Sequence, residues 1–350
     1  MINPVAVAIP FFFAAIGVEA WIGRNRAWYR VNDTHANLGA GVLDQVSGAV
    51  LGMAVILPYV WLYDHRVASV PDGIFALAIA VLLVDFAYYW WHRLSHRVAW
   101  MWAIHSVHHQ SVEYNLAVGL RQDMFAKLNS WVFYLPLAVV GLSPAMMLGA
   151  RSIDLLYQFW IHTRAIDKLG PVELVMNTPS HHRVHHAINT RYIDKNYGGI
   201  FIVFDRMFGT FTPEVDAPDF GTVVPFESWN PLTANLRPWR DLWAKMKGLS
   251  TTREKVAVWW RPPDWLPGGA AYAFPSDAEI TARARYDADA PHWHRRLLVS
   301  WVLVAIGTVG LLVAADSVGV TCKLFLTTGI AGTLGFLATR LDGGAAVERS

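Results

Sequence analysis

The 350-residue sequence predicts an all-α fold, a polytopic membrane helical bundle with a cytosolic helical cap that carries a histidine-rich di-metal site. Three observations lead to this fold class. Hydrophobic residues make up 54% of the chain and charged residues only 16%, against about 25% charged residues in soluble globular proteins. Several apolar stretches approach or exceed the roughly 20 residues that cross a bilayer as a helix. Finally, ten of the fourteen histidines lie between positions 92 and 186, in regular spacings.

The apolar stretches define the expected membrane helices. In chain order they cover residues 5–22, 38–63 and 74–91, a hairpin over residues 131–161, and a second hairpin over residues 297–315 and 320–341. Gly141 and Pro144 interrupt the first hairpin, so its turn is expected near residues 142–144. The chain then divides into N-terminal membrane helices (1–70), a core with the histidine motifs (71–215), a cytosolic extension (216–296) and a C-terminal membrane hairpin with its tail (297–350).

Basic residues set the expected orientation of these helices. Arg24, Arg26 and Arg30 follow the first span, and cytoplasmic loops are usually enriched in Lys and Arg. Placing this cluster in the cytosol puts both histidine-rich regions on the cytosolic side. We therefore expect a multi-pass protein of a bacterial inner membrane or the endoplasmic reticulum, with its active site in the cytosol.

Composition excludes several classes of protein. The single cysteine, Cys322, allows neither a disulfide framework nor a thiolate-held iron–sulfur cluster. A formal net charge of +2 is too small to indicate a nucleic-acid partner. A dinucleotide-binding glycine fingerprint and a P-loop are also absent from the sequence.

The clustered histidines form three motifs and one isolated residue. The first motif is HxxxH, and the next two are HxxHH. Residues i, i+3 and i+4 share a helix face, so each motif is expected to direct two or three imidazoles to one point. One ion takes about four to six ligands, so the set predicts two ions. The predicted metal ligands are His92, His96, His105, His108, His109, His162, His181, His182, His185 and His186.

The residues alone leave the metal open. Zinc would supply a Lewis acid or a bound hydroxide, as in a zinc-dependent lipid hydrolase. Iron would supply oxygen chemistry, which an unactivated alkyl C–H bond of a lipid requires. A metal transporter is a third interpretation, but its histidines should line a route across the bilayer, whereas these lie at the ends of the predicted spans.

Longer segments around the motifs carry a resemblance to a known family. The sequence resembles the fatty acid hydroxylase / sterol desaturase superfamily of integral membrane oxidases, and within it the alkylglycerol monooxygenases most. Apart from the motif spacing, the likeness lies in residues 85–93 (DFAYYWWHR), 120–122 (LRQ), 157–163 (YQFWIHT), 177–186 (NTPSHHRVHH), 194–198 (DKNYG) and 204–211 (FDRMFGTF).

The resemblance implies an activity and its cofactors. It implies a membrane-bound di-iron, O2-dependent oxidase that hydroxylates or desaturates an alkyl C–H bond of a lipid. Ether lipid hydroxylation with tetrahydrobiopterin is one form of this activity, and sterol or fatty-acyl oxidation with a ferredoxin- or cytochrome-type donor is the other. The chain itself encodes no electron carrier, so the reductant is expected to be external.

Polar residues near the motifs are expected to orient the imidazoles. Asp85 lies seven residues before His92, on the same helix face, and a carboxylate inside a span is costly and usually functional. Together with Asp85, Glu113 and Asn196 are predicted as catalytic residues. Arg121 and Arg183 are expected either to bind a lipid head group or to mark the cytosolic boundary.

Overall fold

The computed structural model describes residues 4–283, 286, 294–314 and 317–348. All regular elements in these residues are helices, accompanied by two isolated β-bridges, and the predicted all-α fold class is confirmed. The long helices are α1 (Pro4–Ile22), α2 (Val31–Asp64), α3 (Ile74–Arg97), α7 (Pro144–Trp160), α10 (Pro231–Lys247), α13 (His294–Ala314) and α14 (Val320–Glu348). The shorter α-helices are α4 (Ala99–His109), α5 (Ala126–Ser130), α6 (Leu135–Val139), α8 (Pro179–His186), α9 (Val203–Met207), α11 (Thr252–Trp260) and α12 (Asp277–Thr281).

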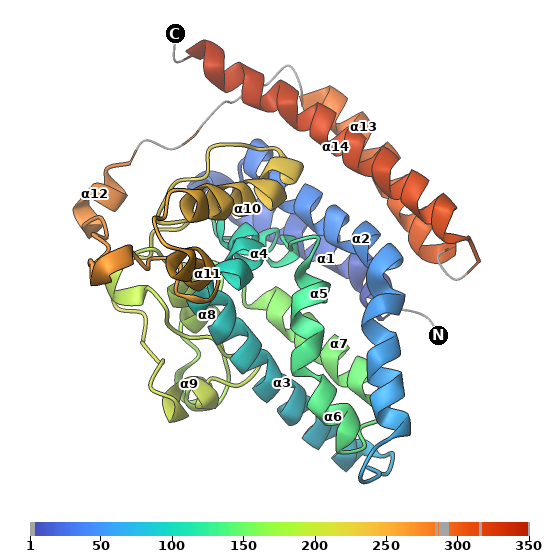
Figure 1. Ribbon diagram of the computed structural model, residues 1–350. Coiled ribbons are helices and arrows are strands. Elements are labelled where there is room, and N and C mark those ends of the chain that lie inside the picture. The colour runs from blue at the N-terminus through green and yellow to red at the C-terminus, as the bar shows by residue number, and fades with distance from the viewer. Residues whose placement is uncertain (1–3, 284–285, 287–293, 315–316, 349–350) are drawn as a thin grey trace.

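Two apolar cores hold the long helices together. The first joins α2, α3, α6 and α7 and includes the buried side chains of Tyr59, Val84 and Met147. The second lies where the α13–α14 hairpin packs along α2 (Figure 1), and it includes Leu43 and Leu334. Burial of each large apolar side chain contributes about 1.5–3 kcal/mol to stability. Because α2 contributes residues to both cores, it connects them.

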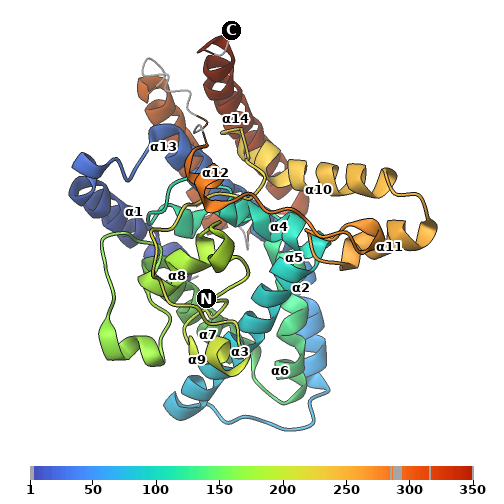
Figure 2. The same ribbon diagram turned by 90° about the vertical axis from the view of Figure 1, so that its left-hand side faces the viewer.

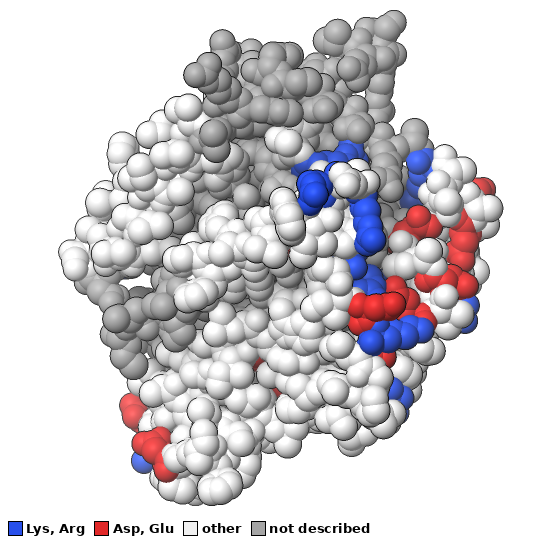
Figure 3. All heavy atoms as spheres, turned by 180° about the vertical axis from the view of Figure 1, so that it is seen from behind, with Lys and Arg blue, Asp and Glu red and all other residues white. Residues whose placement is uncertain are grey.

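Two helices in the described residues are long and apolar enough to cross a membrane. They are α3 and the segment Val320–Thr339 of α14. The two halves of α2, Val31–Gly52 and Ala54–Asp64, would form a third span if counted together, although they are bent by 47°. A broad surface with very few acidic or basic side chains lies on the side opposite to the view of Figure 1, between charged regions at its edges (Figure 3).

The expected hairpin over residues 131–161 is only partly helical. Its turn lies between Val139 and Pro144, close to the predicted position. The first arm is broken into a 3-10 turn and the short α6, because Pro136 has no N–H to continue a helix from the preceding turn. The second arm, α7, carries an ion pair between the partly buried Arg151 and the buried Asp154. Neither arm is among the helices of the described residues that are long and apolar enough to cross a membrane.

Shorter helices gather where α3 ends (Figures 1 and 2), and two of them, α4 and α8, carry the HxxHH motifs. α4 follows α3 directly and packs on it through Trp91 and Met101. α8 begins with Pro179 in its first turn, where the missing N–H costs no hydrogen bond. The 3-10 turns along the chain are Arg24–Arg26, Val118–Leu120, Trp131–Phe133, Gly170–Leu174, Thr190–Tyr192 and Pro267–Gly269.

Candidate metal centre

The structure gathers nine histidines into two groups at the end of α3. Within each group, the potential ligand atoms all lie within 4.8 Å of one another. Cluster 1 consists of His92, His96, His105, His109 and His185. Cluster 2 consists of His108, His162, His182 and His186. All nine side chains are buried, none with more than 8% of its surface exposed.

Each HxxHH motif contributes to both clusters. On α4, His105 and His109 belong to cluster 1, and His108 belongs to cluster 2. Residues i and i+4 are about 40° apart around a helix, whereas i+3 and i+4 are about 100° apart. The i, i+4 pair therefore shares one cluster and the middle histidine points to the other. The expectation that each HxxHH motif converges on one point is wrong.

The third motif mirrors this arrangement. His182 and His186 of α8 belong to cluster 2, and His185 belongs to cluster 1. The ring centroids of His109 and His186 are 4.4 Å apart, which places the two clusters side by side. α4 and α8 thus act as two bridges between neighbouring sites, while α3 serves cluster 1 alone.

Backbone carbonyls determine which ring nitrogens carry protons. A carbonyl oxygen can only accept a hydrogen bond, so the Nδ1 atom that contacts it must hold the proton. The Nε2 atom of the same neutral ring is then a bare lone pair, which is the form that binds a metal. The Nδ1-to-carbonyl distances are 2.7 Å for His92 to Tyr197, 2.8 Å for His108 to Arg121, 2.7 Å for His162 to Gln158, and 2.9 Å for His185 to Lys195.

In cluster 2 the lone pairs of His108 and His162 face each other, with their Nε2 atoms 3.2 Å apart. The Nε2 atom of His182 lies 3.0 Å from that of His162. Burial lowers the pKa of His108 to about 4 and the pKa values of His162 and His182 well below their ordinary value. The rings are therefore neutral at pH 7, and a cation between them would relieve the repulsion of their lone pairs.

Cluster 1 also holds ring nitrogens that lie close together or have no hydrogen-bond partner. The Nε2 atoms of His92 and His105 are 2.9 Å apart, and the Nε2 atoms of His96 and His185 are buried without a hydrogen-bond partner. Such atoms are costly unless they bind something. Imidazole nitrogen suits iron, zinc and copper, so the nine side chains fit two transition-metal ions with a ligand shell of histidines.

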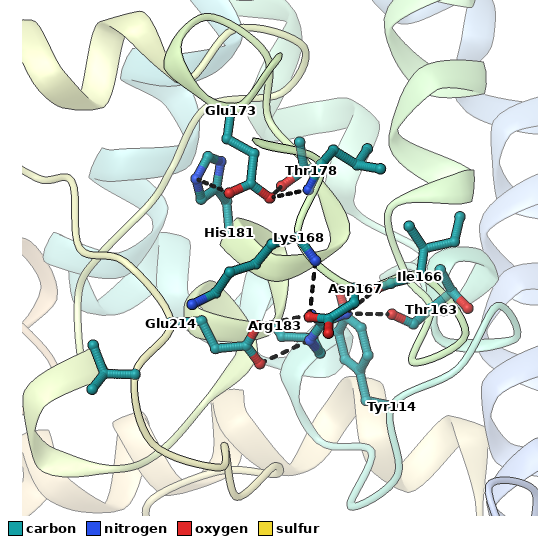
Figure 4. Close-up of polar contacts among 12 residues, drawn as sticks. Tyr114, Thr163, Ile166, Asp167, Lys168, Glu173, Thr178, His181, Arg183 and Glu214 are labelled. Carbon is teal, nitrogen blue, oxygen red and sulfur yellow. Dashed lines mark hydrogen bonds and ion pairs between the residues drawn. The ribbon is translucent and has the colours of Figure 1, made fainter. Parts of the chain in front are cut away.

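His181 is the predicted ligand that the structure leaves outside both clusters. Its Nε2 atom lies 3.9 Å from an oxygen of Glu173, on the far side of α8 (Figure 4). Glu173 also accepts a hydrogen bond from the Thr178 hydroxyl. One residue before His182, the His181 side chain points about 100° away from it around the helix. The structure thus brings together nine of the ten predicted histidines.

Asp85 supports the two histidine clusters indirectly, through a loop. Its two carboxylate oxygens accept hydrogen bonds from the backbone N–H groups of Ile200 and Phe201, at 2.8 and 2.9 Å. A side chain at Gly199 would place its Cβ 2.4 Å from the Asp85 carboxylate, so only glycine permits this close approach. Asp85 therefore fixes the loop whose Tyr197 carbonyl orients His92.

Glu113 and Asn196 also lie away from the nine imidazoles. The buried carboxylate of Glu113 forms ion pairs with Arg30 at 3.7 Å and Arg164 at 3.3 Å. The side-chain amide of Asn196 donates to the His181 carbonyl at 3.0 Å and holds the loop after α8 in place. All three residues predicted as catalytic are therefore found in positions that support the loops around the clusters.

The two arginines expected at a head group or boundary are buried instead. Arg121 donates to the Val107 carbonyl and to the side chains of Asn37 and Gln110. Arg183 forms a two-pronged ion pair with Glu214 (Figure 4) and also donates to backbone carbonyls. Protein partners therefore take up most of the N–H donors of both guanidinium groups.

A cavity of about 410 Å³ opens beside the clusters. His96, His109, His185 and His186 line its inner end. Its walls are mainly apolar and come from α4, α10 and the loops around them, with Trp102, Ala103, Val224, Phe226, Leu242 and Phe274 among them. The Trp102 ring lies 5.0 Å from His96 and 5.5 Å from His109. An alkyl chain in this cavity would contact the histidines that line it.

Sequence reasoning missed several groups at the site. The carbonyls that orient the imidazoles belong to Arg121, Gln158, Lys195 and Tyr197, and a backbone acceptor leaves no signal in residue type. Ser106 was also missed. Its hydroxyl is buried, lines the cavity and has no hydrogen-bond partner. Its place between His105 and His108 was the one signal that could have pointed to it.

Comparison with known proteins agrees with this geometry. Residues 77–210 match the family model described as fatty acid hydroxylase. The matched range contains all nine clustered histidines. The predicted resemblance is confirmed, and the two helices long and apolar enough to cross a membrane agree with it.

Individual relatives show a likeness over a longer part of the chain. The alkylglycerol monooxygenase of Danio rerio is 38% identical over 266 residues, which cover 75% of this chain and 59% of that protein. The alkylglycerol monooxygenase of Homo sapiens is 37% identical over 266 residues, with 75% and 60% covered. Ornithine lipid hydroxylase OlsE of Rhizobium tropici is 24% identical over 150 residues, with 42% and 45% covered. The chain thus spans about 60% of the length of the two alkylglycerol monooxygenases. No solved structure matches it.

Proposed function

We propose that the chain is a membrane-bound, O2-dependent di-iron enzyme that hydroxylates an alkyl C–H bond of a lipid. The observation that carries this proposal is the grouping in two adjoining clusters of nine buried imidazoles, four of which line a mainly apolar cavity. The similarity to alkylglycerol monooxygenases supports it. All nine clustered histidines are proposed as metal ligands, and His181 is not.

Iron held by these clusters would supply the oxidising chemistry that an unactivated C–H bond requires. The reaction balances when one O2, two electrons and two protons enter. One oxygen atom is inserted into the C–H bond, and the other leaves as water. The electrons come from an external reductant, either tetrahydrobiopterin or a ferredoxin- or cytochrome-type donor. Removal of a second hydrogen from the lipid in place of insertion would give desaturation.

The residues of the chain bind and orient the lipid. The apolar walls around Trp102 and Leu242 accept the alkyl chain and exclude water from the reacting carbon. The unpartnered Ser106 hydroxyl donates a hydrogen bond to a polar oxygen of the lipid, which sets the carbon that lies beside His109. The class of substrate is therefore a lipid whose alkyl chain carries a polar atom close to the reacting position, as an ether lipid does.

We place the centre on the cytosolic side of the membrane. Arg24 and Arg26 follow α1 in a short 3-10 turn, and cytosolic loops are enriched in such residues. The C-terminal end of α3 carries His92 and His96 and is followed directly by α4. A multi-pass protein in a bacterial inner membrane or the endoplasmic reticulum fits this arrangement.

The test is a defined reconstitution of the full chain in nanodiscs. Anaerobically purified protein receives an alkylglycerol lipid, isotopically labelled O2 and a reductant, and O2 uptake and product mass are measured. We expect lipid-dependent O2 uptake and one labelled oxygen atom in the lipid. Loss of two hydrogens without oxygen gain would identify a desaturase. Lipid hydrolysis by a zinc-loaded protein without O2 uptake would refute the proposal.

A further inference from the structure

The hairpin formed by α10 and α11, residues 231–261, differs in charge from the rest of the chain. It carries two acidic side chains and seven basic ones, while the whole chain has a formal net charge of only +2. The basic residues are Arg237, Arg240, Lys245, Lys247, Arg253, Lys255 and Arg261. Helices of this composition that also present tryptophan bind anionic lipid surfaces.

The outer face of α10 combines apolar and basic side chains. Leu236, Arg240, Trp243 and Lys247 follow one another at helical spacing and are exposed. Leu236 is 55% exposed and Trp243 is 50% exposed. The Lys247 ammonium lies 5.8 Å from the centre of a Trp243 ring. Tryptophan and lysine in this arrangement are typical of the membrane–water interface, where an aromatic ring and a charged tip are both accommodated.

α11 extends this exposed surface. Val256 is 61% exposed and Trp260 is 65% exposed, one helical turn apart on the face that also presents Arg253. The two helices pack against each other, and the rings of Trp243 and Trp259 are 6.0 Å apart. Exposed large apolar groups so close together usually mark an interaction site.

Both ends of the hairpin are attached to the ends of apolar spans. Asn230, which caps α10, donates to the carbonyl of Gly335, near the end of the span Val320–Thr339. At the other end, the Arg261 carbonyl accepts a hydrogen bond from the Ala99 N–H at 2.9 Å, directly after α3 ends. The hairpin therefore lies at one boundary of the membrane, and it extends sideways from the bundle (Figure 2).

The inner face of α10 borders the cavity of the metal centre. Pro238 and Leu242 line that cavity. Pro238 has no N–H for the Ala234 carbonyl, and the Gln110 side chain donates to this carbonyl instead, at 3.1 Å. Because Gln110 follows His109, the position of α10 is linked directly to cluster 1.

We propose that the α10–α11 hairpin lies in the plane of the membrane surface and binds the anionic phospholipids of the leaflet at which α3 and α14 end. Trp243 and Trp260 lie among the lipid head groups, and the basic side chains contact lipid phosphates. This contact brings the cavity wall to the lipid surface. The docking itself does not depend on the proposed catalytic function.

Site-directed fluorescence tests this surface in the full chain. The single cysteine is removed as Cys322→Ser, and an environment-sensitive fluorophore is attached in separate variants at Trp243→Cys and Val256→Cys. Val215→Cys provides the matched control, because Val215 is 63% exposed and lies outside the hairpin. Quenching by iodide in water and by head-group spin-labelled lipid is measured in nanodiscs with and without phosphatidylglycerol.

We expect labels at positions 243 and 256 to be quenched several-fold more by labelled lipid, and less by iodide, than the label at 215. The double substitution Arg240→Glu and Lys247→Glu should remove this difference in nanodiscs with phosphatidylglycerol. Equal iodide quenching at all three positions would overturn the proposal. Protection from iodide without lipid quenching would mean that protein, and not lipid, covers the surface and would also overturn the proposal. None of these readouts uses enzyme activity, so they remain informative if the catalytic proposal fails.

Discussion

The Nε2 atoms of His108 and His162 lie 3.2 Å apart, although each ring already donates its Nδ1 proton to a backbone carbonyl. Neither neutral ring has a proton left for the other, so the contact is not a hydrogen bond. Buried lone pairs in this position are costly, and a shared cation would satisfy them. This pair gives the metal interpretation a basis in the hydrogen-bonding geometry as well as in the motif spacing.

Replacing single histidines should distinguish metal ligands from histidines that only lie nearby. His185→Ala removes a member of cluster 1 and should reduce bound iron from two ions per chain to one or none. His181→Ala changes the same helix outside both clusters and should keep both ions. Metal content of the purified proteins is the measurement. Equal iron loss in the two variants would make His181 a ligand and contradict the division into nine and one.

Asp85→Asn should loosen the loop that orients His92. An amide offers one acceptor oxygen where the carboxylate accepts two N–H groups, so one buried donor loses its partner at a cost of about 1–3 kcal/mol. Loss of such supporting contacts typically weakens metal binding about 10–100-fold. The rate of iron release to a chelator should rise, whereas the exposed control Asp72→Asn should leave it unchanged. Lower thermal stability with an unchanged release rate would limit Asp85 to a role in folding.

Arg121→Lys tests whether this arginine is structural. Its guanidinium is 2% exposed and bonds three partners, a geometry that an ammonium group cannot reproduce. We expect a loss of about 1–3 kcal/mol in unfolding free energy. The exposed control Arg240→Lys should cost less than about 0.5 kcal/mol. Thermal unfolding in nanodiscs measures both, and weaker lipid binding at unchanged stability would restore the head-group role for Arg121.

Ser106→Ala should change substrate preference more than the rate with a plain alkyl chain. The hydroxyl is proposed to donate to a polar oxygen of the lipid, and a lost hydrogen bond costs about 0.5–1.5 kcal/mol, a roughly 2- to 12-fold loss in kcat/KM. The ratio of kcat/KM for an ether lipid to that for the corresponding hydrocarbon is the measurement. An unchanged ratio would show that Ser106 does not contact the substrate.

The sequence predicts the helical class and the histidine set because both depend on residue type and spacing. The partition of His108 from His105 and His109 required knowing where α3 and α8 lie around α4, since the i+3 and i+4 positions differ by about 100°. The hydrogen bonds from His92 and His185 end on carbonyls, which every residue possesses. These features arise from tertiary packing and could not be predicted from one chain.

The charged residues were harder to predict than the histidines. A buried arginine such as Arg121 looks in sequence like a basic residue at a membrane boundary, and only its three partners reveal its structural role. Asp85 was correctly singled out as a buried carboxylate. Its partners, however, are the N–H groups of a loop more than a hundred residues later in the chain, so its effect on His92 is indirect.

The metal content of the anaerobically purified full chain, measured together with lipid-dependent O2 uptake, tests the central claim most directly. The two histidine clusters predict two iron ions per chain and O2 uptake that requires both lipid and reductant. X-ray absorption at the iron edge should show a shell of imidazole nitrogens. Stoichiometric zinc with no O2 uptake under any of these conditions would contradict the account.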